Sequence, residues 1–224
     1  LLWIRRRGKL AKFIRGSWVF EEVINTRKII NTIERAGRTC YKSEHNIKDG
    51  SAERFIENII KRGHESVLEH EKITVRIICD RGVSHELVRH RIASYSQESS
   101  RYCNYSNDRF GNEITFIVPV GLELGNLDIE DKTDWRIVWE NAMNNAEESY
   151  LHLIRLGAKP DLARGVLPTD VKTEIVVTMN LREWRHFFKL RTVQAAHPNI
   201  RYIARDMLKS FKTLLPCVFS DIEY

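Results

Sequence analysis

The chain has 224 residues, of which 42% are hydrophobic and 29% are charged, a mixture typical of globular proteins. No apolar run approaches the roughly 18 residues that a membrane span requires, so we expect no membrane partner. The formal net charge is +6, and the basic residues of positions 1–16 account for all of it because no acidic residue stands among them.

Residues 1–16 form a basic N-terminal arm that we expect to lie outside the core of a single domain, residues 17–224. A nucleic-acid partner requires basic residues on the folded domain itself, so we predict none. An RNA-binding protein led by this arm is the weaker alternative. The apolar residues 1–4 precede the basic ones, the reverse of a secretory signal, and the four cysteines form no CxxC pair. We therefore expect a cytoplasmic protein with reduced thiols.

Four segments have apolar side chains that recur every three or four residues, the periodicity of an amphipathic helix. They lie at about residues 23–36, 51–63, 135–157 and 200–211. Glycines at the ends of the first three predict where those helices stop. We expect all four apolar stripes to face the core.

Three shorter segments, residues 73–77, 114–118 and 171–179, alternate in polarity or are rich in β-branched residues, as strands are. Helices and strands are interleaved without a GxGxxG turn, which argues against a Rossmann unit and a P-loop. The fold class that we predict is α+β, a single mixed domain with a small, mainly antiparallel sheet flanked by helices.

The densest polar cluster is residues 89–102, with three arginines, one histidine and several hydroxyl groups. Guanidinium groups bind phosphate oxygens bidentately, so we favour an anion site here over a solvated helix end. Residues 63–70 hold two histidines, but their spacing favours turn residues over a metal site. Residues 180–191 predict a basic helix. Ser99 lacks a nucleophile elbow, so we assign it to binding.

These clusters resemble the flavin-dependent thymidylate synthase family. The run Arg89-His90-Arg91, seven residues and then Ser99 is similar to its RHRxxxxxxxS signature. Residues 64–70, the Ala-Arg-Gly-Val-Leu-Pro turn at 163–168 and the late helix at 180–191 resemble further family motifs in the same order. The resemblance extends from about residue 33 to about residue 208.

The resemblance implies reductive methylation of dUMP to dTMP in nucleotide biosynthesis. It implies FAD as the cofactor, NADPH and methylenetetrahydrofolate as co-substrates, no metal, and a homotetramer whose active sites are shared between subunits. The alternative is a flavin-free protein that holds a nucleotide or phosphate with the same arginines.

The site residues follow by position from the resemblance. FAD contacts are implied for Ser66, Arg89, His90, Arg91, Gln97, Asn180, Leu181, Arg182 and His186. Contacts with dUMP are implied for Glu86, Leu87, Val88, Arg89, Gln97, Glu98, Ser99, Ser100, Arg101, Arg164 and Arg191. Arg191 is implied as the catalytic residue, a fixed cation that stabilises charge on N3 and O2 of the uracil ring. Some members have a different residue where this chain has Glu86, Gln97, His186 and His197.

Overall fold

The computed structural model describes residues 11–106, 113–122 and 131–224, apart from the side chains of 131–134. The chain divides into two compact units, which are described in turn. Of the described residues, unit 1 contains 11–16, 78–84, 97–106, 113–122 and 131–174, and unit 2 contains 17–77, 85–96 and 175–224. The predicted α+β class, with a small, mainly antiparallel sheet flanked by helices, is confirmed.

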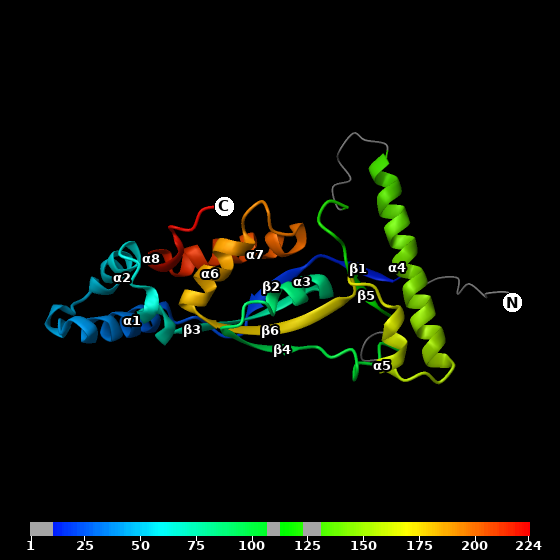
Figure 1. Cartoon of the computed structure of the whole chain (residues 1–224), viewed down its shortest axis with the longest axis horizontal. Helices are drawn as coiled ribbons and strands as arrows, with labels where there is room; N and C mark the ends of the chain where they lie inside the picture. The colour runs from blue at the N-terminus through cyan, green and yellow to red at the C-terminus, as the bar shows by residue number, and fades with distance from the viewer. Residues whose placement is uncertain (1–10, 107–112, 123–130) are drawn as a thin grey trace. The chain divides into compact units, whose positions relative to one another are not determined.

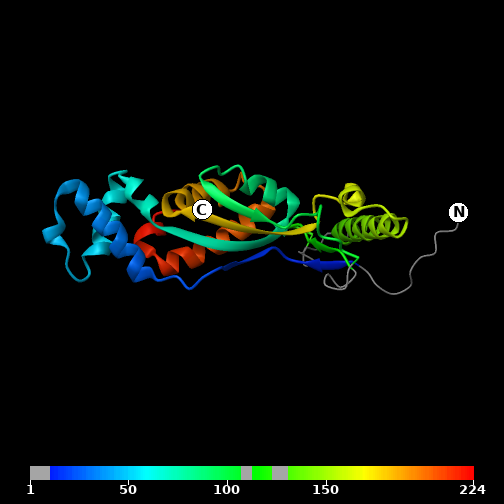
Figure 2. The same ribbon diagram turned by 90° about the horizontal axis from the view of Figure 1, so that it is seen from below.

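Unit 2 is built on a four-stranded antiparallel sheet in the order β2-β3-β6-β4. The strands are β2 (Ser17–Phe20), β3 (Lys72–Asp80), β6 (Lys172–Asn180) and β4 (Ala93–Gln97). Burial alternates along β3 and β6, as the sequence predicted for both. Helices α6 (Leu181–Arg191) and α7 (Pro198–Leu214) cover one face of this sheet (Figures 1 and 2). The sheet therefore carries α6, the predicted late helix, as a fixed element.

An aromatic cluster holds α6 on the sheet. Trp184 and Phe188 are fully buried, and their rings lie 5.3 Å and 5.0 Å from the ring of Phe211 on α7. The indole Nε1 of Trp184 donates a hydrogen bond of 3.0 Å to the backbone oxygen of Ile73 on β3. Burial of such rings contributes several kcal/mol each and leaves α6 little freedom to rotate.

The other helices of unit 2 are α1 (Thr26–Tyr41), α2 (Ser51–Lys61) and α8 (Pro216–Phe219), with single turns at η1 (Glu44–Asn46) and η2 (Glu65–His70). Asn25 caps α1, since its side-chain oxygen accepts from the Lys28 amide at 2.9 Å. The expected end of this helix near Gly37 is wrong, because α1 continues to Tyr41. Gly37 is instead the point where the Phe55 ring of α2 approaches the α1 backbone.

Unit 1 packs α4 (Asp131–Arg155) beside a parallel pair of strands, β1 (Lys12–Ile14) and β5 (Thr115–Ile117). It also contains α5 (Pro160–Ala163) and η4 (Arg164–Val166), and α3 (Arg81–Leu87) begins in it. Met143 and Tyr150 of α4 are buried with Phe116. The expectation that the whole stripe of α4 faces the core is wrong, because Trp135 is 58% exposed and Val138 is 67% exposed in this single chain.

Part of the predicted basic arm belongs to unit 1. Ala11 is buried in its core cluster, and its amide donates to Asn144 Oδ1 at 2.9 Å. Residues 12–14 pair with β5 as strand β1. Residues 11–14 of the arm therefore take part in the packing of unit 1. Residues 1–10 lie outside the described residues, and so does most of the loop expected after Gly121.

Within the ranges that the structure describes, none of the helices combines the length and the apolar character that crossing a bilayer requires.

The close approach of α2 to Gly37 generates a prediction about stability. A methyl group at this position would lie 2.5 Å from two carbons of the Phe55 ring. Alanine normally stabilises a helix by about 1 kcal/mol over glycine, but overpacking costs about 1–3 kcal/mol. We expect Gly37→Ala to lower the free energy of unfolding by about 1–2 kcal/mol in urea titrations.

The control is the same substitution in a Phe55→Leu background. A leucine leaves room for the methyl group, so Gly37→Ala should be neutral or stabilising there. Equal destabilisation in both backgrounds would contradict the packing explanation.

Candidate functional site

A chain of hydrogen bonds joins the end of α3 and the loop after it to both ends of α6. Nη1 of Arg191 donates to Glu86 Oε2 at 2.6 Å, and its Nη2 donates to the backbone oxygen of Glu86 at 3.2 Å. Nε of Arg191 donates to His90 Nε2 at 3.1 Å. The other ring nitrogen of His90, Nδ1, lies 3.3 Å from Glu183 Oε1. Three residues of the predicted site, Glu86, His90 and Arg191, are thus brought together with Glu183.

The protonation state of His90 follows from these contacts. Because Nε2 accepts from Arg191, the ring proton of the neutral form resides on Nδ1, where it is donated to Glu183. Burial, then the positive charge of Arg191 and then His186 lower the pKa of His90 to about 4. Burial raises the pKa of Glu183, while His186 opposes that shift. Both shifts disfavour a charged pair, so we assign a neutral imidazole hydrogen-bonded to the carboxyl group.

The backbone around His90 is held by Tyr95 on β4. The Tyr95 hydroxyl lies 2.6 Å from the backbone oxygen of Leu87 and 2.7 Å from that of His90. The His90 ring itself packs on Phe187 of α6, with ring centroids 5.1 Å apart. Burial, followed by the charge of Glu183, raises the pKa of Tyr95 to about 12, so its hydroxyl stays a donor.

The start of helix α6 is capped and lines a cavity. Asn180 caps it, with its side-chain oxygen accepting from the Glu183 amide at 2.8 Å. The first turns of α6 then line a cavity of about 480 Å³ together with η2 and Ile92. Its lining residues are Glu65, Glu69, Ile92, Asn180, Arg182, Glu183, His186 and Lys189. Three residues that the sequence predicted as FAD contacts, Asn180, Arg182 and His186, therefore face one cavity.

The two outer arginines of the Arg-His-Arg run differ from the buried histidine between them. Arg89 and Arg91 are exposed, and their guanidinium groups have no hydrogen-bond or ion-pair partner within the described part of the chain. Arg182, by contrast, is paired with Glu69 at 2.6 Å. The run therefore offers two exposed cations beside one buried neutral imidazole, an arrangement suited to an anionic ligand.

Six further predicted contacts lie in unit 1. Arg164 Nη1 donates to the buried Ser100 hydroxyl at 3.0 Å, and the Ser99 hydroxyl accepts from the Arg101 amide at 3.4 Å. Glu98 accepts from Lys172 Nζ at 3.1 Å and from the Tyr105 hydroxyl at 3.1 Å. Gln97 Nε2 donates to the hydroxyls of Ser84 and Thr173. The structure thus joins Arg164 to Ser100, the residue that follows the signature serine.

Some predicted residues have limited means of contact. The side chains of Leu87 and Leu181 are buried in the core, so only their backbone groups remain for a ligand. Val88 and Ser66 are exposed on the surface of unit 2. His64 of the second cluster shares a hydrogen bond of 2.7 Å with the Tyr41 hydroxyl and lies at the start of η2.

Glu183 is the residue that sequence reasoning missed. It stands inside the predicted basic helix, and nothing local in the sequence pairs it with His90, 93 positions earlier. Ligand atoms of His90, Glu183 and His186 lie within 4.8 Å of one another, a spacing compatible with a metal ion. His90 Nδ1 and the Glu183 carboxyl group already share a hydrogen bond, so a metal ion bound by both would have to displace the Nδ1 proton.

Comparisons with known proteins agree with the sequence motifs. A family model described as "Thymidylate synthase complementing protein" matches residues 22–217. Flavin-dependent thymidylate synthases from Geobacter sulfurreducens and Pyrococcus furiosus are 39% and 37% identical over 193 and 191 residues. These alignments cover 83% and 82% of this chain, and 78% and 75% of the relatives. A relative from Mycobacterium bovis is 36% identical over 209 residues, which cover 85% of this chain and 78% of the relative.

A solved structure has the same fold. It is the UMP/dUMP methylase PolB from Streptomyces cacaoi bound with 5-Br dUMP, with a TM-score of 0.74 and 23% identity. The match covers 93% of this chain and 95% of that one. That likeness concerns the fold. The family model and the curated relatives establish the family: the chain belongs to the flavin-dependent thymidylate synthases.

Proposed function

We propose that this protein converts dUMP to dTMP by reductive methylation, with methylenetetrahydrofolate as the carbon donor. When bound, FAD supplies the hydride that completes the methyl group, after NADPH has reduced it. The hydrogen at C5 of the uracil leaves as a proton, so the products are dTMP and the folate without its one-carbon unit. Family membership supports the reaction class, and the way Arg191 is held supports its role.

Arg191 is a preorganised cation in this proposal. One N–H on each of its three nitrogens is used by His90 and Glu86, which leaves two of its five N–H groups for a ligand. We assign these two donors to the N3 and O2 edge of the uracil ring. A guanidinium that is already fixed stabilises charge developing there without reorganising during the reaction.

The residues of unit 2 fit the flavin cofactor by their chemistry. FAD carries a diphosphate, and the unpaired guanidinium groups of Arg89 and Arg91 are suitable partners for it. We place Asn180, Arg182 and His186, from the cavity on α6, against the same cofactor, with Ser66 nearby. Leu181 then contributes through its backbone, because its side chain is buried. His90 is buried, and its neutral ring orients Arg191.

The residues of unit 1 fit the phosphate and sugar of dUMP. Arg164 and Arg101 provide charge, and Ser99 and Ser100 provide hydroxyl donors. We assign the same substrate to Gln97, Glu98 and the backbone of residues 86–89. In the family that the chain belongs to, active sites are shared between the subunits of a homotetramer, so these residues can serve a site completed by another copy.

We propose Glu183 as a positioning residue. Its carboxyl group accepts the His90 Nδ1 proton and thereby leaves Nε2 as the acceptor for Arg191. If Nδ1 lost this partner, the imidazole could adopt the other tautomer, and its Nε2 proton would then face the Arg191 donor. Glu183 therefore acts on Arg191 through His90, without touching substrate.

Replacing Arg191 tests the proposed function. We expect Arg191→Ala to lower the rate of dTMP formation by about 10²–10³-fold, the usual loss when a preorganised donor is removed. Arg191→Lys keeps the charge but not the planar geometry and should also lose much of the rate. Both variants should still bind FAD, seen as flavin absorption near about 450 nm.

Lys209→Ala, which removes an exposed cation from α7, is the matched control and should be fully active. The NADPH-driven reduction of flavin and the formation of dTMP are measured separately in all variants. Production of dTMP at near the wild-type rate by Arg191→Ala would sink the assignment. A wild-type protein that neither contains nor takes up FAD would sink the proposed function.

The pKa of His90 predicts how stability depends on pH. Because it falls from 6.5 to about 4 on folding, the unfolded chain takes up this proton first as the pH decreases. The stabilisation from the neutral ring is complete above pH 6.5 and is lost between pH 6.5 and about 4, up to about 3 kcal/mol. We expect the difference in unfolding free energy between wild type and His90→Gln to shrink by about 2 kcal/mol between pH 7.5 and pH 5.

Urea titrations at each pH measure this difference, and His45→Gln, at an exposed histidine, is the control that should keep the wild-type dependence. Parallel curves for wild type and His90→Gln would mean that His90 is not buried as a neutral ring.

The exposed apolar residues of α4 predict part of the tetramer interface. Trp135 and Val138 are one helical turn apart, and large apolar side chains exposed together mark association surfaces. We expect Val138→Glu to shift the protein from tetramer to smaller species in analytical ultracentrifugation. Lys209→Glu, which places a carboxylate on an exposed position of α7 instead of α4, should leave the tetramer intact. A Val138→Glu variant that stays tetrameric places the interface elsewhere.

A further inference from the structure

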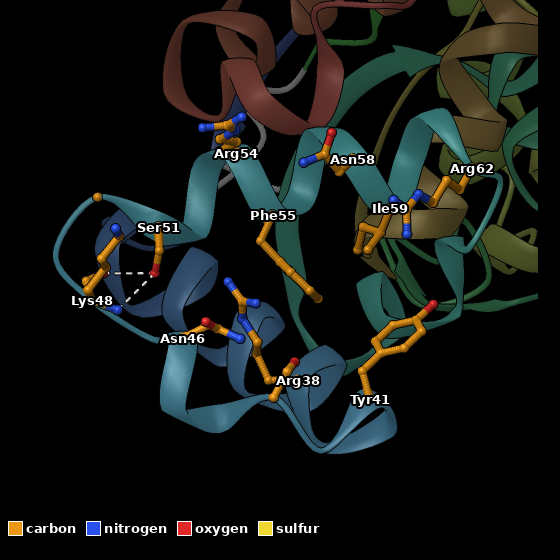
Figure 3. A pocket seen from close by; sticks show the side chains of 12 residues that line it. Arg38, Tyr41, Asn46, Lys48, Ser51, Arg54, Phe55, Asn58, Ile59 and Arg62 are labelled. Atoms are coloured by element: carbon orange, nitrogen blue, oxygen red, sulfur yellow. Dashed lines mark hydrogen bonds between the residues drawn. The ribbon is translucent and has the colours of Figure 1, made fainter.

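A second cavity in unit 2 is rich in positive charge. It lies between α1, η1 and α2 and has a volume of about 520 Å³ (Figure 3). Its lining includes the cations Arg38, Lys48, Arg54 and Arg62, and among the described residues no acidic side chain lines it. None of its lining residues belongs to the FAD or dUMP contacts assigned above.

Two of the four cations belong to a regular pattern on one face of α2. Arg54, Asn58 and Arg62 recur every four residues along α2, so they form a single row beside the cavity. The side chains of Arg54 and Arg62 have no ion-pair or hydrogen-bond partner within the chain as described. Like charges arranged in this way repel one another and create a local positive potential, which an anion relieves.

Arg38 is the cation of the cavity whose side chain is held in place by other residues. Its Nε and Nη2 donate to Glu34 Oε1 at 3.1 Å and 2.9 Å, and its guanidinium carbon lies 4.7 Å from the centre of the Phe55 ring. These contacts fix the planar group, and Nη1 takes part in neither hydrogen bond. Figure 3 shows Arg38, Asn46 and Phe55 directed toward one another. A fixed guanidinium loses little entropy when it binds a phosphate.

A neighbouring cavity of unit 2, which shares Lys48 and Gly50 with the first, has a different charge distribution. It is lined by both signs of charge, with Glu34, Asp49 and Glu53 among its residues. Arg27 there is paired with Asp49 at 3.2 Å. Because Glu34 also pairs with Arg38, the excess positive charge of the first cavity lies on Arg54 and Arg62, which do not line the second cavity, and on Lys48, which lines both.

The rest of the first cavity is suited to an aromatic base and its polar edge. The Tyr41 residue is 52% exposed, and its hydroxyl is tied to His64, which fixes the ring at the rim. Ile59 and Phe55 add apolar surface, and the amides of Asn46 and Asn58 supply donors and acceptors. We propose that this cavity binds a nucleoside di- or triphosphate, with its phosphates on the arginines and its base against Tyr41.

Isothermal titration calorimetry tests the proposal on the whole protein with FAD and dUMP both in excess. ATP and dTTP are the probes, and inorganic tripolyphosphate and adenosine are the partial ligands. We expect at least one nucleotide to bind, and tripolyphosphate to bind about tenfold more weakly because it lacks a base that stacks. Adenosine, which lacks the phosphates, should also bind more weakly than the nucleotide.

Two pocket variants and one control locate the binding. Arg54→Gln and Arg62→Gln should each weaken nucleotide binding about tenfold, the effect of losing one charge-assisted hydrogen bond. Lys61→Gln removes the same charge from an exposed neighbour of Arg62 that does not line the cavity, so it should bind as the wild type does. Because these side chains are exposed, all three variants should keep the wild-type melting temperature.

The proposal would be overturned if no nucleotide bound, or if tripolyphosphate bound as tightly as the nucleotide. It would also be overturned if the pocket and control variants lost affinity equally, or if the pocket variants lost FAD together with the nucleotide. The last would assign the cavity to the flavin site. Since binding and not turnover is measured, the outcome is independent of the proposed dTMP synthesis.

Discussion

The interaction on which the candidate site of unit 2 depends is the packing of α6 between an aromatic core and a buried histidine. Trp184 and Phe188 fix one face of the helix against β3 and α7. Phe187, from the same helix, forms the apolar surface on which the His90 ring lies. Because the core fixes both the rotation and the axial position of α6, it also fixes Glu183 and Arg191, which the helix carries to either side of His90.

Burial keeps His90 neutral, so the neutral and the charged groups of the site have separate functions. A charged imidazole at His90 would lie beside the guanidinium of Arg191, where both desolvation and repulsion are unfavourable. The ring therefore stays neutral and acts as a connector, accepting on one nitrogen and donating on the other. Glu183 is also buried, so its hydrogen bond to His90 satisfies a polar group that would otherwise be costly. The positive charge of the site is left to arginines.

Sequence reasoning recovered the elements with strong periodicity. The helices near residues 51–63 and 200–211 and the strands near 73–77 and 171–179 are confirmed, because each has a complete apolar face that the core buries. It missed β1, β2 and β4, which are short and have too few residues for a period to emerge. It ended α1 at Gly37 because glycine usually stops a helix, whereas here the missing side chain admits a ring from α2.

The site was predictable to a similar extent and for a similar reason. The Arg-His-Arg run and the late helix are local patterns, and the structure brings His90 and Arg191 into contact. The role of Glu183 depends on a contact between positions 93 residues apart, which no local pattern contains. The different environments of the three residues in the run also depend on tertiary structure, since burial of His90 alone distinguishes it from Arg89 and Arg91.

The same geometry gives Glu86 a significance that its sequence position does not suggest. A cation that stabilises developing negative charge must be held in place, but a full negative charge 2.6 Å away also weakens its field. The backbone oxygen of Glu86 and the His90 ring hold Arg191 without that cost, because both are neutral. A Gln at position 86 would keep an acceptor for Arg191 and remove the charge. In this chain the Glu86 carboxylate weakens the field of Arg191, while two of its N–H groups stay available, which favours a ligand that presents two acceptors at once over one that presents a single oxygen.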